Sequence, residues 1–332
     1  MAAFVFATCL PGVEPALKLD VARTRPELRF AYSRPGLVTF KSTRPVPPDD
    51  PPGSVFAHVW GRSLGAAGDP ASAVQALAGL GHTRVHAFAR DPEVVVDLAT
   101  WQALGPGGPA ALDELVADVI VGPPGEPVWL GAHRHDRFRL PNAGGAIPVE
   151  LPADAPSRAY AKIEEAIAWA SLPVVRGQVA LEIGAAPGGA VLALARRGLE
   201  VWGVDTGELA ANVLAMPGVH HVAKKVGALR WEELPPRIDW LLVDVNLAPQ
   251  VALHEVARLM PRLKTTLVGA VFTLKLNDWT FVAELPALVE RIRQMGLPDV
   301  RMRHLPSNRR EICAVALSRP APAQRRIGQP RG

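Results

Sequence analysis

Four charged residues in the second half of the chain could act together on a hydroxyl group. Lys162 lies in a helix-like segment, whereas Asp244, Lys275 and Glu311 each stand at one end of an apolar, strand-like run. A charge at the end of a buried strand is costly unless it has a partner, so these side chains are expected to point into one cleft. A lysine in such a cleft can act as a base if burial or a neighbouring cation lowers its pKa.

Each residue also has an ordinary structural alternative. Asp244 and Lys275 could form a salt bridge at the edge of the core, and Lys162 could pair at the surface with Glu165, three residues further along its helix. Glu311 could be a solvated strand start. As a set, two lysines sharing a cleft are expected to depress each other's pKa while the carboxylates hold them in place. We therefore assign the role of base, or of the group that orients the hydroxyl, to Lys275.

A glycine-rich loop, LEIGAAPGG over Leu181–Gly189, follows a strand-like run and precedes a helix. Three interpretations compete. A dinucleotide fingerprint matches poorly, because the loop offers Gly184, Ala186 and Gly189 with Pro187 inside. A tight turn without a ligand is the plain structural alternative. An S-adenosylmethionine loop, typical of methyltransferases, is favoured, with Gly184, Gly188 and Gly189 allowing close backbone approach.

A carboxylate downstream supports that interpretation. Asp205 ends the next apolar run, VWGVD, where it could accept hydrogen bonds from two ribose hydroxyls of a bound cofactor. A capping role alone is the alternative for Asp205. The residues expected to bind the cofactor are Gly184, Ala186, Pro187, Gly188, Gly189, Asp205 and Asp244.

The elements that must position these residues alternate between helices and apolar strands. Helices are expected at 156–172, 190–197, 250–259 and 282–295, and strands at 179–183, 200–204, 239–245, 266–276, 300–303 and 311–317. This alternation predicts an α/β fold, a Rossmann-like domain with a mostly parallel, doubly wound sheet, over 150–318.

The first 149 residues have a different pattern. Strands are expected at 3–7, 37–40, 55–59, 84–88 and 116–121, with a helix over 70–81, which predicts a smaller α+β region. A Pro/Gly-rich connector, 138–155, separates the two parts. The tail 319–332 is rich in Pro and Arg and is expected to be a disordered basic segment.

Composition limits the class of protein. Of 332 residues, 48% are hydrophobic and 20% charged, which excludes a largely disordered chain. The net charge is +4, a mild indication of an anionic partner. Cys9 and Cys313 are expected to be reduced core thiols, the amino terminus is no convincing signal peptide, and no apolar run could span a bilayer. A soluble, cytoplasmic protein is expected.

Together these segments resemble the FtsJ-like superfamily of RNA ribose 2'-O-methyltransferases, and most closely its branch that modifies cytidine in large-subunit ribosomal RNA. The resemblance rests on PADAPSRAYAKIEEA, LEIGAAPGG, VWGVDTG, WLLVDV and FTLKL, the first being the most specific. The resemblance extends weakly into the first half through the segments CLPGVEPAL, TRVHAFARDPE and DVIVGPPGEPVWLGAHRH. This half resembles a reduced THUMP module for RNA binding.

The resemblance implies S-adenosylmethionine-dependent methylation of a ribose 2'-hydroxyl in 23S rRNA, with no DNA or membrane partner. Lys162, Asp244, Lys275 and Glu311 match its catalytic tetrad, with Glu311 positioning Lys162 or the ribose. Four positions depart from the family pattern, which puts cofactor affinity in question. Glu182 stands where the family has an Asp, and Ala190 where it has an aromatic residue. Val226 stands in place of an Asp near adenine, and Ala159 in place of a hydroxyl residue.

Other residues were weighed for RNA or metal binding. The basic segments 133–139, 301–304 and 308–310 could hold phosphates, or could be solvated faces. His133 and His135 form an H-x-H, but no third ligand is evident in the sequence, so no metal is expected. A non-catalytic RNA-binding or ribosome-assembly protein and a small-molecule O-methyltransferase remain the alternative functions.

Overall fold

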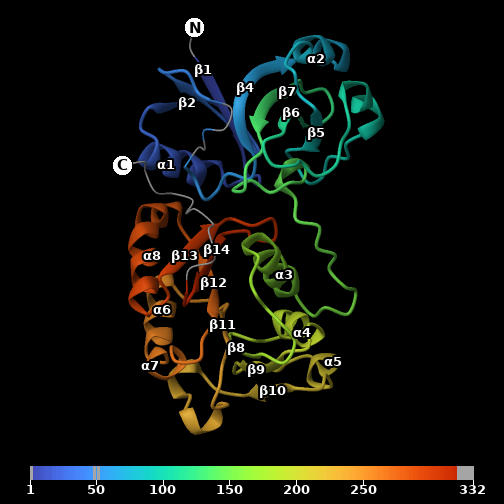
Figure 1. The fold of residues 1–332 in the computed structure, drawn as a ribbon. Coiled ribbons are helices and arrows are strands. Elements are labelled where there is room, and N and C mark those ends of the chain that lie inside the picture. Colours follow the sequence, from blue (N-terminus) through green and yellow to red (C-terminus); the bar gives the residue numbers. More distant parts are fainter. Residues whose placement is uncertain (1–2, 48–49, 51–52, 320–332) are drawn as a thin grey trace. The chain divides into compact units, whose positions relative to one another are not determined.

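The computed structural model describes residues 3–47, 50 and 53–319, which form two compact units (Figure 1). Unit 1 runs from Met1 to Ile147 and unit 2 begins at Pro148. The expected tail lies outside the described residues from position 320 onward. Among the described residues, no helix has the length and apolar character needed to cross a membrane.

Unit 1 is built on a seven-stranded sheet of order β2-β3-β1-β4-β7-β6-β5. Only β5 and β6 pair in parallel; the other neighbours are antiparallel. Its strands are β1 (Ala3–Thr8), β2 (Leu28–Arg34), β3 (Leu37–Ser42), β4 (Trp60–Ala67), β5 (Arg84–Ala89), β6 (Leu115–Val121) and β7 (Val128–Arg134), and its helices are α1 (Glu14–Thr24), α2 (Pro70–Leu77), η1 (Leu98–Leu104) and η2 (Ala143–Gly145).

The strand expected at 55–59 is wrong. The segment is irregular although Phe56 and Val59 are buried. Val55 N–H and Val59 N–H donate to side chains, to Asp20 Oδ2 at 3.1 Å and to Thr8 Oγ1 at 3.1 Å. The segment shares backbone hydrogen bonds with Thr8 at the end of β1, where His58 N–H donates to the Thr8 carbonyl at 2.8 Å, but it forms no continuous ladder. Burial of its apolar residues therefore gives a strand-like pattern without a strand.

Unit 2 contains a second seven-stranded sheet, of order β10-β9-β8-β11-β12-β14-β13. Strands β8 to β12 are parallel, and β14 returns antiparallel between β12 and β13. The strands are β8 (Val179–Ile183), β9 (Glu200–Val204), β10 (Val219–Val222), β11 (Trp240–Val243), β12 (Gly269–Lys275), β13 (Asp299–Arg303) and β14 (Glu311–Leu317).

Helices lie on both faces of this sheet (Figure 1). They are α3 (Ala159–Ala170), α4 (Gly189–Arg196), α5 (Ala211–Leu214), α6 (Pro249–Ala257), α7 (Met260–Leu263) and α8 (Leu285–Gln294), with 3₁₀ turns η3 (Val226–Ala228), η4 (Trp231–Glu233) and η5 (Trp279–Glu284). The expected α/β, mostly parallel, doubly wound architecture is present. Strand order reverses between β8 and β11, so the carboxyl edge there is the place where such sheets bind ligands.

Candidate active site

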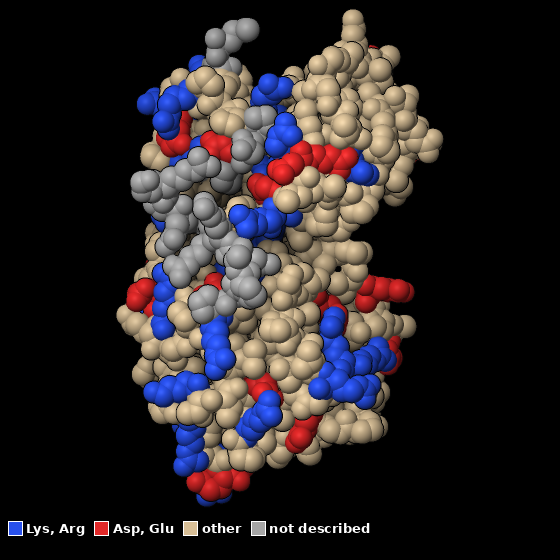
Figure 2. All heavy atoms as spheres, in the orientation of Figure 1, with Lys and Arg blue, Asp and Glu red and all other residues tan. Residues whose placement is uncertain are grey.

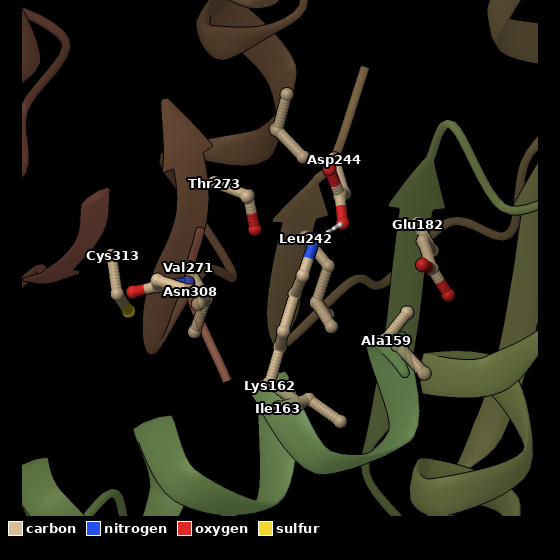
Figure 3. Close-up of a pocket in the computed structure, with 12 residues that line it drawn as sticks. Ala159, Lys162, Ile163, Glu182, Leu242, Asp244, Val271, Thr273, Asn308 and Cys313 are labelled. Carbon is tan, nitrogen blue, oxygen red and sulfur yellow. Dashed lines mark hydrogen bonds and ion pairs between the residues drawn. The ribbon is translucent and has the colours of Figure 1, made fainter. Parts of the chain in front are cut away.

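The carboxyl edge of unit 2 brings all four predicted charged residues together. Asp244 follows β11, Lys275 ends β12, and Glu311 opens β14. Because β14 is antiparallel, its first residue lies at the carboxyl ends of its neighbours, and the register sets Glu311 directly opposite Lys275. Lys162 reaches the same point from α3, as Figure 3 shows.

The four side chains form a closed ring of alternating charge. Lys162 Nζ lies 3.0 Å from Asp244 Oδ2 and 2.5 Å from Glu311 Oε1. Lys275 Nζ lies 2.8 Å from Asp244 Oδ1 and 2.9 Å from Glu311 Oε2. Each carboxylate thus places one oxygen against each lysine, and the ring carries no net charge.

The ring changes the expected electrostatics. Burial disfavours the Lys275 ammonium, but Asp244 and Glu311 outweigh it, so the pKa of Lys275 is raised above its ordinary value. The expectation that two lysines would depress each other is therefore wrong for Lys275 in the free chain. The reason is that two carboxylates contact Lys275 Nζ, at 2.8 and 2.9 Å, and favour its charged form.

Glu165 has a different role from the one considered for it. This residue is buried on α3 and does not pair with Lys162. Its Oε2 accepts from the Ser307 N–H at 2.9 Å and its Oε1 from the Ser307 hydroxyl at 2.7 Å. Glu165 therefore ties the helix that carries Lys162 to the segment that leads into Glu311.

The glycine loop lies at the same edge, between β8 and α4. Gly184 and Gly188 have φ of +87° and +108°, as a tight turn requires. A Cβ on Gly184 would lie 2.2 Å from the Asp244 carbonyl oxygen, and one on Gly189 would lie 2.3 Å from Ser157 Oγ. The glycines thus permit close approach of the chain to itself, not only to a ligand.

Asp205 ends the following strand and faces this loop. Its Oδ2 accepts from the Ala186 N–H at 3.0 Å and its Oδ1 from the Gly207 N–H at 2.8 Å. The capping alternative is therefore present, yet each oxygen keeps a second lone pair that could accept a ribose hydroxyl. The residues fit the cofactor set expected from the sequence without excluding the purely structural role.

Glu182 is a feature that the sequence did not predict as functional. It is buried on β8 and its Oε2 has no partner among the described residues. Burial raises its pKa well above the ordinary value, and Asp244 and Asp205 add to the shift. The sequence signals were an acidic residue inside an apolar strand and the departure of Glu182 from the pattern that the chain resembles.

A small cavity of about 20 Å³ connects Glu182 with the charged ring, large enough for about one water molecule. Lys162, Asp244, Thr273, Asn308, Cys313 and Ala159 also line it (Figure 3). Among the positions that depart from the family pattern, Ala159, Glu182 and Ala190 lie here, whereas Val226 is in η3. Three of the four departures therefore cluster at one pocket.

The basic segments are less available than a phosphate-binding role needs. In 133–139, His133, His135 and Arg139 are buried, and in 301–304 Arg303 and His304 are buried. On the face drawn in Figure 2, described Lys and Arg side chains of unit 2 lie in separate groups interspersed with acidic ones. Arg309 and Arg310 are exposed and remain the better candidates.

Comparison with known proteins gives the context for this site. No family model matches. The chain is similar to ribosomal RNA large subunit methyltransferase M. It is 35% identical over 223 residues to that of Alkalilimnicola ehrlichii and 31% identical over 224 residues to that of Azoarcus sp.. These alignments cover 61% and 60% of this chain and 59% of each relative, so the chain spans about three fifths of their length.

Solved structures overlap more loosely. TrmN from Thermus thermophilus is 14% identical with a TM-score of 0.37, covering 95% of this chain and 99% of its own. A fibrillarin pre-rRNA processing protein from Methanococcus jannaschii is 13% identical with a TM-score of 0.37, covering 48% of this chain and 76% of its own. Overlap at this level does not identify a shared function.

Proposed function

We propose that this protein is an FtsJ-like methyltransferase that moves a methyl group from S-adenosylmethionine to a ribose 2'-hydroxyl of large-subunit ribosomal RNA. The observation that carries the proposal is the closed Lys162–Asp244–Lys275–Glu311 ring at the carboxyl edge of the sheet. Similarity to methyltransferase M supports the substrate. Unit 1, as a reduced THUMP-like module, would bind the RNA, and an rRNA substrate places the enzyme in the cytoplasm.

The loop 184–189 and Asp205 would hold the cofactor. When bound, S-adenosylmethionine supplies a methyl group activated by a positively charged sulfonium. The unpartnered Glu182 Oε2 and the open lone pairs of Asp205 are the polar atoms at this edge that a ligand could satisfy.

Lys275 carries the proton transfer in this proposal. As the 2'-oxygen takes up the methyl group that bound S-adenosylmethionine would supply, leaving a neutral thioether, the hydroxyl proton would pass to Lys275 Nζ. Only the deprotonated amine can accept it, and Asp244 and Glu311 hold most of the population protonated at neutral pH. A cation bound nearby would offset this carboxylate field and lower the pKa of Lys275.

Lys162 and the two carboxylates act on geometry. Asp244 and Glu311 each contact both lysines, so they fix Nζ of Lys275 in one place. Lys162 places its positive charge against the oxygen of each carboxylate that does not contact Lys275, which keeps the ring neutral. Removal of one member leaves a partly buried charge without its partner.

The experiment uses the full chain, methyl-labelled S-adenosylmethionine and large-subunit rRNA that lacks the modification. Alkaline hydrolysis should leave the label in a dinucleotide, since a 2'-O-methyl blocks cleavage at that position. Lys275→Ala should lower transfer by about 10²–10⁴-fold while cofactor binding stays near the wild-type value. Lys264→Ala, an exposed lysine outside the site, should behave as wild type.

Three outcomes would overturn the proposal. Label on a base instead of a ribose would exclude 2'-O chemistry. Binding of RNA without any transfer, or without S-adenosylmethionine binding at millimolar cofactor, would favour a non-catalytic RNA-binding protein. Transfer to small hydroxylated compounds but not to RNA would favour a small-molecule enzyme.

A further inference from the structure

Unit 1 contains a group of side chains that could bind a metal. His86 on β5, Asp118 on β6 and His133 on β7 come from three adjacent strands. The register pairs His86 with Asp118, and Asp118 with Gly131, two residues before His133. All three side chains therefore project from the same face of the sheet.

The three residues are close enough to share one ion. One ligand atom of each lies within 4.8 Å of the others, and all three residues are at least 98% buried. His133 Nδ1 lies 2.6 Å from Asp118 Oδ2. The sequence showed only the H-x-H of His133 and His135, because the other ligands are 15 and 47 positions away from His133.

Two polar atoms in or beside the group would gain a partner from a bound cation. Asp118 Oδ1 is fully buried and has no partner among the described residues. A buried carboxylate with one unsatisfied oxygen is costly, and a cation would compensate it. His135 Nδ1, beside His133 with ring centroids 6.2 Å apart, is likewise buried and unpartnered in the part of the chain that the structure describes.

The hydrogen bond of His86 fixes a tautomer suited to a metal. Its Nε2 lies 3.0 Å from the Gly108 carbonyl oxygen, which can only accept, so Nε2 carries the proton. In the neutral ring Nδ1 then has a free lone pair. An imidazole that donates its outer N–H to a backbone carbonyl is the usual arrangement around metal-ligating histidines.

We propose that His86, Asp118 and His133 form a structural site for a divalent transition metal, with Zn²⁺ as the ion that two imidazoles and a carboxylate suit best. His135 or a solvent molecule would complete the coordination. The ion would take the place of the hydrogen bond between His133 Nδ1 and Asp118 Oδ2. The site would join β5, β6 and β7 of unit 1.

The test is metal binding by the untagged full chain, stripped with chelator and titrated with ZnCl₂ by calorimetry. We expect one Zn²⁺ per chain with micromolar affinity or tighter. Co²⁺ in place of zinc should give the visible absorption of a four-coordinate site. A wild-type chain that binds no stoichiometric zinc overturns the proposal without any variant.

Variants locate the site. His86→Gln and Asp118→Asn should each weaken zinc binding by about 100-fold or more, while His82→Gln, a histidine of the same unit outside the group, should leave it unchanged. Circular dichroism confirms that each variant is folded. If one of the two ligand variants, His86→Gln or Asp118→Asn, does not fold, loss of the Co²⁺ spectrum in the other ligand variant tests the assignment. Full affinity in a folded His86→Gln chain would place the metal elsewhere and contradict the assignment.

Discussion

The four charged residues of the site could be predicted from the sequence, but their mutual arrangement could not. Strand ends identify Asp244, Lys275 and Glu311 because charges are rare in buried strands. The direct pairing of Lys275 with Glu311 depends on β14 running antiparallel beside β12, which no local pattern encodes. For the same reason the direction of the Lys275 pKa shift was predicted wrongly: it depends on which charges are nearest.

The raised pKa of Lys275 predicts how methyl transfer responds to pH. Below this pKa the deprotonated fraction grows about tenfold for each pH unit, so the rate should rise with a slope near one from pH 7 to pH 9. The second-order rate constant at limiting cofactor measures it, because that constant reports the pKa of the chain before the cofactor binds. A rate that does not change over this range would show that Lys275 is not the base.

Glu182 predicts a pH-dependent stability difference. Its folded-state pKa is raised, so its contribution to stability is most favourable at low pH and is lost as pH rises from the unfolded towards the folded pKa. Glu182→Gln cannot ionise, so the variant does not lose stability in this way as the pH rises. The melting temperature of the variant should exceed that of wild type at pH 8 by about 2–4 °C per kcal/mol gained. The difference in melting temperature between the variant and wild type should shrink towards pH 5. A difference that is smaller at pH 8 than at pH 5 would contradict the prediction.

At the scale of elements, most of unit 2 followed from apolar runs separated by helices. β8, β9 and β14 have the predicted bounds. β10 was not predicted, because VHHV is short and half polar. In unit 1, α1, β2, β4 and β7 were also missed, since glycines and charged residues interrupt their patterns.

The loop after β8 gives a test of why its first glycine is needed. Gly184→Ala and Gly177→Ala both impose a positive φ, +87° and +83°, on a residue with a Cβ. Gly177 has open space around it, so its substitution should cost about 1–2 kcal/mol. Gly184→Ala should cost more, because its Cβ also meets the Asp244 carbonyl. Denaturant unfolding of both variants measures this, and equal costs would show that the contact is unimportant.

The bond between α3 and the segment before β14 should matter for activity. Glu165→Ala removes both hydrogen bonds to Ser307 and should lower stability by about 1–3 kcal/mol. It should also lower the rate constant for methyl transfer with little change in cofactor affinity. Glu164→Ala, also on α3, breaks an ion pair with Arg197 at the end of α4; it is the matched control and should cost about 0–1 kcal/mol. Equal rates for the two variants would exclude a positioning role for Glu165.

At the scale of the whole molecule, unit 2 begins at Pro148, within the Pro/Gly-rich connector predicted at 138–155. The sequence could not reveal the histidine–aspartate group of unit 1, because its members come from three strands. It also suggested basic surface segments whose residues are in part buried. RNA recognition therefore needs a direct measurement and cannot be inferred from charge counts.

The most direct test of the account is a map of 2'-O-methylated nucleotides in large-subunit rRNA from cells that express the wild-type chain, Lys275→Ala or Lys264→Ala. Resistance of each phosphodiester bond to alkaline cleavage gives the map. We predict one 2'-O-methyl that is present with the wild-type and Lys264→Ala chains and absent with Lys275→Ala. A map that Lys275→Ala leaves unchanged would contradict the assignment of this site as a ribose 2'-O-methyltransferase.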